Sequence, residues 1–192
     1  MTATDEHWHG SEDLRKRLVE LTRDLILILS TWDRPGEIDK CMKFVINHTD
    51  VSDGITVHRF REHDALSTLL LPSKIPSPDI MLFGHLDVIS LPEGTEYRSS
   101  LRGGRIYGPG AADMKGELAI LLEIFRVFHE KYPGISLGLA VTSDEEQGGT
   151  YGTRFLLEDF GLRFGTAIVP DAGSINDIAV EEKGTLHLKI RT

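Results

Sequence analysis

The sequence predicts an α/β fold in which helices pack on a mostly parallel central sheet. Short, nearly continuous apolar runs alternate along the chain with segments of helical periodicity, which is the pattern of strands connected by crossover helices. Polar and acidic residues follow directly after several of these apolar runs. Because ligands bind beyond the carboxyl ends of the strands in such sheets, these residues are the first candidates for a functional site.

The N-terminal part predicts two helices and then two strands. Acidic residues directly after Ser11 are typical of a helix start with a serine N-cap, and leucines then recur at helical spacing. After a Pro-Gly loop a second amphipathic segment follows, and then two stretches rich in β-branched and apolar residues. The expected order is helix 11–29, helix 38–48, strand 54–60 and strand 65–71.

The remainder alternates buried strands with helices. The first of these strands is apolar on both faces, and a long loop separates it from a strongly periodic helix that Pro133 and Gly134 terminate. No internal repeat interrupts the pattern. The expected order is strand 79–89, loop 91–113, helix 114–132, strand 135–143, helix 150–161, strand 166–171, and strands 177–184 and 185–192.

Composition excludes several classes of protein. The formal net charge of −9 argues against nucleic acid and against an anionic membrane as partners. The longest apolar run, 25–29, is too short to span a bilayer, and the first residues lack the order of a secretory signal. The single cysteine, Cys41, excludes an internal disulfide and is expected to be a buried, inert thiol. A cytoplasmic setting is therefore expected, and His7 and His9 are expected to have no function in a polar tail.

Acidic residues and one histidine gather at four strand ends of the expected sheet. They are His85 and Asp87, Asp113, Glu145 with Glu146, and Asp171. Carboxylates that converge on one edge of a sheet cannot all stay ionised without a counter-charge. Lys115 alone is insufficient, and it is interpreted as a solvated lysine at a helix start. A histidine with carboxylates therefore predicts a divalent metal such as zinc, manganese or cobalt.

The spacing of His85 and Asp87 supports this interpretation. Residues i and i+2 lie on one side of an extended chain, so Asp87 can accept a hydrogen bond from the second ring nitrogen of His85 and orient it toward a metal. The alternative is a dinucleotide site at "GPGAAD", 108–113. There Asp113 would stand at the third glycine position and repel a pyrophosphate, so this alternative is disfavoured.

Four motifs, "GHLDVIS", "GPGAADMKGE", "SDEEQGG" and "VPD", resemble in order and spacing the M20 family of metallopeptidases. The resemblance covers about residues 12–192. It implies a zinc-exopeptidase-like catalytic domain with two metal ions, usually Zn²⁺, with Co²⁺ or Mn²⁺ as alternatives. The resemblance implies that His85 and Asp171 bind the first metal and that Asp87 orients His85. It implies that Asp113 bridges both metals and that Glu146 binds the second. Glu145 has the implied role of general base.

The same resemblance implies hydrolysis of an amide or peptide bond in a small peptide or N-acyl amino acid. A bridging water would lose its proton to Glu145, which then passes the proton to the departing amine. In this family the residue after the position of Asp113 often follows a cis peptide. The glycines of these motifs are expected to shape the backbone around the site.

The resemblance also implies a division of the chain. A disordered tail is expected over 1–10, the N-terminal part of the catalytic domain over 11–183, and the first strand of an inserted lid or dimerisation domain over 184–192. His187 in that strand matches no family ligand. A later family histidine that completes the second metal site has no counterpart here, so little turnover is expected from the 192 residues alone.

This truncated pattern has two interpretations. Either the chain is a fragment of a longer metal-dependent hydrolase, which would form a homodimer through the inserted domain, or it is a shortened relative that serves as a metal-binding or interaction module without catalysis. Because the family pattern stops within an expected strand rather than at a domain boundary, the fragment is favoured.

Overall fold

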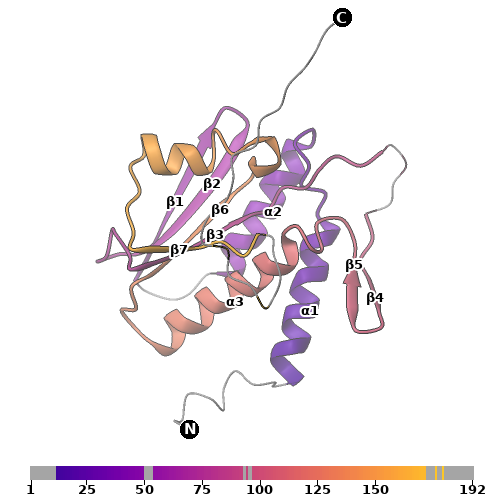
Figure 1. The fold of residues 1–192 in the computed structure, drawn as a ribbon, viewed down its shortest axis with the longest axis horizontal. Helices are drawn as coiled ribbons and strands as arrows, with labels where there is room; N and C mark the ends of the chain where they lie inside the picture. The colour runs from indigo at the N-terminus through magenta and orange to yellow at the C-terminus, as the bar shows by residue number, and fades with distance from the viewer. Residues whose placement is uncertain are drawn as a thin grey trace, which may run out of the picture.

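A computed structural model describes residues 12–49, 54–92, 94, 97–171, 176 and 179. The chain begins with two helices and a β-hairpin, and then alternates between strands and helical segments (Figure 1). The helices are α1 (Glu12–Leu27), α2 (Pro35–His48) and α3 (Lys115–Lys131). The strands are β1 (Ile55–Glu62), β2 (Ala65–Pro72), β3 (Ile80–His85), β4 (Ser100–Arg102), β5 (Arg105–Tyr107), β6 (Leu137–Thr142) and β7 (Thr166–Ile168).

The central sheet has five strands in the order β1-β2-β6-β3-β7. The pairs β6–β3 and β3–β7 are parallel, whereas β1–β2 and β2–β6 are antiparallel. The α/β class is therefore confirmed, but the sheet is mixed rather than mostly parallel. The reason is local: β1 and β2 are joined by a tight turn at His63 and Asp64, which can connect only antiparallel neighbours.

Two apolar layers enclose the sheet. On one face, side chains of α1, α2 and α3 pack against alternate residues of β2, β3 and β6, such as Leu70, Leu82 and Leu139. On the other face, Leu69, Met81 and neighbouring residues pack against the segment that carries Leu156 and Leu162. This second segment contains a π-helical turn, Phe155–Asp159, where a continuous helix was expected over 150–161.

The long segment expected to be a loop over 91–113 contains a small hairpin of β4 and β5. Strands β3 and β7 end earlier than the sequence indicated, at His85 and Ile168, and Asp87 and Asp171 follow within a few residues of these ends. Ser11 and residues 1–10, and the strands expected over 177–184 and 185–192, lie largely or wholly outside the described residues. Within the described residues, no helix is both long enough and apolar enough to cross a membrane.

Candidate metal centre

The carboxyl ends of β3, β6 and β7 meet at one edge of the sheet. His85, the last residue of β3, is in register with Thr142, the last residue of β6. Ile168 at the end of β7 pairs with Leu82 of β3. The residues that follow these strands therefore converge, as the sequence indicated.

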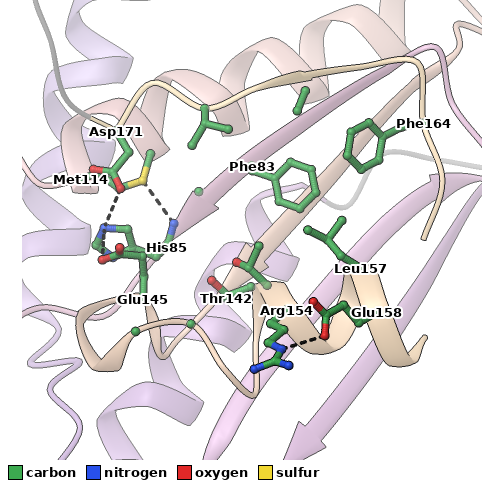
Figure 2. A pocket seen from close by; sticks show the side chains of 16 residues that line it. Phe83, His85, Met114, Thr142, Glu145, Arg154, Leu157, Glu158, Phe164 and Asp171 are labelled. Carbon is green, nitrogen blue, oxygen red and sulfur yellow. Dashed lines mark hydrogen bonds and ion pairs between the residues drawn. The ribbon is translucent and has the colours of Figure 1, made fainter. Parts of the chain in front are cut away.

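His85 lies at the centre of this convergence, and its side chain is 2% exposed. Its Nε2 atom is 3.1 Å from Oδ1 of Asp113, 3.6 Å from Oε2 of Glu145 and 3.7 Å from Oδ2 of Asp171. One atom each of His85, Glu145 and Asp171 can be chosen so that all three lie within 4.8 Å of one another. Donors from three separate segments therefore surround one point, on which a cation could bind (Figure 2).

The other ring nitrogen of His85 is held by Asp87. Nδ1 lies 3.1 Å from the backbone oxygen of Asp87 and 3.3 Å from its Oδ1 atom. These oxygens accept a hydrogen bond, so Nδ1 carries a proton and Nε2 is the nitrogen that faces the carboxylates. Once Nε2 has lost its own proton, the ring has the tautomer that a metal-binding histidine requires.

Electrostatics at the site reflect crowding of like charges. Burial would lower the pKa of His85, but hydrogen bonding to Asp87 and the negative charges of Asp87, Asp171 and Glu145 outweigh burial and raise that pKa to about 9. Burial raises the pKa of Asp171, which the charge of His85 opposes and the charge of Asp113 reinforces. These carboxylates thus lack sufficient positive charge from the protein, and a divalent cation would supply it.

Glu145 and Glu146 begin a short 3₁₀ turn, Glu145–Gln147, which Ser143 and Asp144 connect to the end of β6. Burial raises the pKa of Glu145, as do the charges of Asp171 and other nearby carboxylates, while His85 lowers it. Burial also raises the pKa of Glu146, and the charge of Asp113 is the next contribution. Glu146 is therefore electrically coupled to Asp113, although its carboxylate is not in the group formed by His85, Glu145 and Asp171.

The turn is held in place from both sides. The backbone N–H of Glu146 donates to Oδ2 of Asp87 at 3.0 Å. This bond links the 3₁₀ turn to the residue that holds the ring of His85. Gly148, with φ of 92°, closes the turn in the left-handed region, where glycine is favoured.

The segment that carries Asp113 reaches the site through a loop before α3. A cis peptide joins Asp113 to Met114, at the position where the family resemblance implied one. The sulfur of Met114 accepts the backbone N–H of His85 at 3.3 Å. No sequence pattern indicates this contact, because a methionine at a helix start is indistinguishable from any other core residue.

Lys115 is buried, although the sequence was interpreted as placing it in solvent at a helix start. It is 1% exposed rather than solvated, and its Nζ atom donates to the carbonyl oxygens of Leu25 and Ile28 at 2.9 and 2.7 Å. Burial lowers its pKa. The interpretation was wrong because α1 packs beside the start of α3, a long-range contact that local sequence does not reveal.

A cavity of about 530 Å³ opens beside the site. His85, Glu145 and Asp171 lie at one end, and the apolar side chains of Phe83 and Phe164 lie farther along it (Figure 2). The cluster therefore faces space that a small organic molecule could enter, rather than the packed interior.

Comparison with known proteins supports one family. The family model for Peptidase family M20/M25/M40 matches residues 81–190. A succinyl-diaminopimelate desuccinylase of Sulfurimonas denitrificans is 33% identical over 183 residues, which cover 83% of this chain and 47% of the relative. A [LysW]-lysine/[LysW]-ornithine hydrolase of Sulfurisphaera tokodaii is 34% identical over 112 residues, 58% of this chain and 30% of the relative.

Solved structures share the fold. Human carnosine dipeptidase 1 superimposes with a TM-score of 0.64 at 19% identity, covering 85% of this chain and 40% of the dipeptidase. Aminopeptidase PepT from Bacillus cereus gives a TM-score of 0.63 at 22% identity, with coverage of 83% and 44%. The chain thus spans less than half the length of these relatives.

Proposed function

Because the chain belongs to peptidase family M20/M25/M40, we propose that it carries the metal-binding half of an active site that hydrolyses an amide bond in a small peptide or N-acyl amino acid. The observation that supports this most directly is the arrangement around Nε2 of His85, which faces the carboxylates of Asp113, Glu145 and Asp171 while Asp87 holds Nδ1. The curated relatives named above, a desuccinylase and a hydrolase, agree with this class of reaction.

The donor set fits a zinc ion, or cobalt or manganese. A neutral imidazole with carboxylate oxygens suits these ions. Burial, reinforced by the charge of Asp113, raises the pKa of Asp171, and a bound cation would stabilise its ionised form. We propose His85, Asp113 and Asp171 as ligands of one ion and Asp113 with Glu146 as ligands of a second. When bound, such ions would supply Lewis acidity, which polarises a carbonyl group and makes water more acidic.

Glu145 is the proposed general base. Its side chain is 47% exposed and lines the cavity, so it can reach a water molecule beside a substrate carbonyl. Its raised pKa makes its carboxylate a better proton acceptor than an ordinary surface glutamate. After accepting the proton, Glu145 can return it to the amine that leaves. Asp87 keeps the proton on Nδ1 of His85 throughout.

Calorimetric titration of the metal-free protein with Zn²⁺, Co²⁺ and Mn²⁺ tests the ligand assignment. We expect His85→Ala and Asp113→Ala to reduce the affinity or the stoichiometry. Glu145→Gln should retain binding. His58→Ala is the matched control, because His58 lies on β1, among the aromatic rings of Phe60 and Phe160. Unchanged stoichiometry and affinity in both ligand variants would contradict the metal site.

Hydrolysis of a panel of dipeptides and N-acyl amino acids tests the reaction. In a full-length protein that contains this sequence, Glu145→Gln should lower turnover by about 10²–10⁴-fold, the usual contribution of a general base. Equal turnover by the Glu145→Gln variant would exclude the proposed role. Metal binding with no Glu145-dependent hydrolysis of any substrate would instead favour a non-catalytic metal-binding module.

A further inference from the structure

The C-terminal end of α1 is attached to the segment that carries His85 and Asp87. The hydroxyl of Ser30 donates to the carbonyl oxygen of Leu86 at 2.6 Å, and the carbonyl oxygen of Ser30 accepts the N–H of Val88 at 3.0 Å. Ser30 is fully buried. Because Leu86 lies between His85 and Asp87, these two bonds fix the backbone on which both side chains stand.

Lys115 attaches the same end of α1 to the loop that carries Asp113. Its ammonium group donates to the carbonyl oxygens of Leu25, in the last turn of α1, and of Ile28, the first residue after α1. These two carbonyls also accept the backbone N–H groups of Ile28 and Ser30, so Lys115 adds a second donor to each. Its backbone N–H donates to the carbonyl oxygen of Gly110 at 2.7 Å and closes the loop around Asp113. A cation at a helix C-terminus is also favoured by the helix dipole.

The two ligand segments contact each other directly as well. Gly110 packs against Val88 so closely that a Cβ atom at Gly110 would overlap a methyl group of Val88. On the other side, the N–H of His85 donates to the sulfur of Met114. The end of α1, the segment after β3 and the loop before α3 therefore form a closed ring of contacts, and Lys115 supplies the hydrogen bonds between the first and the third.

We infer that Lys115 is a positioning residue for the metal centre, because it holds the Asp113 loop against α1 and thereby fixes the separation of Asp113 from His85. This inference rests on the proposed metal-binding function. Burying an ammonium group costs several kcal/mol unless its hydrogen bonds are made, so an apolar side chain would fill this position at a lower cost if packing alone mattered. Lys115 does not touch the reacting atoms, and it acts through Asp113.

Amide hydrogen exchange in the metal-free protein tests the positioning. Lys115→Met keeps most of the side-chain volume and removes the ammonium donor. Lys131→Met is the matched control, since Lys131 is the exposed last residue of the same helix. We expect residues 84–88 and 108–114 to exchange about tenfold faster in Lys115→Met, which corresponds to the loss of about one buried hydrogen bond, and at the wild-type rate in Lys131→Met.

Calorimetric titration with Zn²⁺ separates positioning from general stability. We expect Lys115→Met to bind Zn²⁺ about 10–100-fold more weakly than the wild type, the usual effect of removing support from a ligand, when both are measured well below their unfolding temperatures. A purely structural role would lower the unfolding temperature and leave this affinity unchanged. Where Lys115→Met does not fold, Lys115→Gln, which keeps an N–H donor on a shorter side chain, takes its place in the same measurements.

Either wild-type exchange rates in both segments or an unchanged Zn²⁺ affinity in a folded Lys115 variant would overturn the inference. If the wild-type protein itself bound no Zn²⁺, Co²⁺ or Mn²⁺, the proposed function would fail. The exchange rates would then decide alone whether Lys115 holds the Asp113 loop in place.

Discussion

Three adjacent acids after β6 show how neighbouring residues of the same charge acquire different roles. Asp144 is 7% exposed, and its Oδ2 atom accepts the backbone N–H groups of Tyr151 and Gly152 at 2.8 and 3.0 Å. Glu145 is exposed to the cavity, and Glu146 faces the charge of Asp113. Asp144 thus braces the turn, while the other two side chains are free to face the site.

Replacing Asp144 by alanine should destabilise the fold by about 2 kcal/mol, because two backbone N–H groups would lose their acceptor in a mostly buried place. Asp144→Asn keeps an acceptor oxygen and should cost less than half as much. Burial raises the pKa of Asp144 against the effect of the two N–H donors, so the fold disfavours its charge and the removal of that charge carries no penalty of its own. Urea denaturation of both variants and the wild type measures these differences. Equal destabilisation by the two substitutions would contradict the bracing role.

At the scale of residues, the sequence was sufficient to predict where side chains that follow strands would lie. It was insufficient to predict the contacts of side chains that reach across to another element. His85, Glu145 and Asp171 could be placed together because parallel strands end at the same edge, whereas Asp113 comes from the loop before α3, after a hairpin outside the central sheet. Lys115 and Ser30 could not, because their partners lie 90 and 56 residues away in the chain. Nothing in the local pattern distinguishes a buried lysine at a helix start from a solvated one.

At the scale of elements, the apolar runs indicated where strands lie but not how they pair. The run that became β2 is buried along its whole length, as is β6, and buried strands of either direction have the same composition. The tight turn between β1 and β2 indicates the antiparallel direction of that pair only, and the antiparallel pairing of β2 with β6 has no local signal. The π-helical turn and the β4–β5 hairpin are still less visible, since each depends on only a few residues.

Helix α3 is connected to β6 by a histidine. The ring Nε2 atom of His129 lies 2.9 Å from the carbonyl oxygen of Leu137, and the ring packs on Phe125. Burial lowers the pKa of His129 below 6.5, and the hydrogen bond to Leu137 opposes this shift only in part. The unfolded chain therefore binds a proton at this residue more readily than the folded chain does.

Protonation of His129 should therefore lower the free energy of unfolding as the pH falls. The contribution of its neutral form is fully present above the unfolded pKa of about 6.5 and is lost as the pH falls from there through the lower folded pKa. We expect His129→Gln, which can still donate to Leu137, to weaken the loss of stability between about pH 7.5 and about pH 5.5. Urea denaturation at both pH values gives the comparison, with His58→Gln as the control. An identical pH dependence in His129→Gln and the wild type would show that this residue is not responsible.

At the scale of the whole molecule, the candidate metal centre brings together acidic residues from four segments of the chain. Its residues come from the ends of β3, β6 and β7 and from the loop before α3. These carboxylates repel one another, and the positive charge within reach is mainly that of His85. The site therefore opposes the compact fold until a cation balances it.

A divalent metal should accordingly stabilise the entire domain. An ion that binds only the folded chain contributes about 2.7 kcal/mol when its free concentration is 100 times the dissociation constant. For a domain of this size that corresponds to a rise in unfolding temperature of about 5–10 °C. Thermal unfolding after treatment with a chelator, with and without added Zn²⁺, should show this rise in the wild type and a much smaller one in His85→Ala. His58→Ala should behave as the wild type, since its imidazole lies on β1 among Phe60 and Phe160. A rise of equal size in His85→Ala would mean that Zn²⁺ stabilises the chain at a place other than the edge of the sheet where the strands converge.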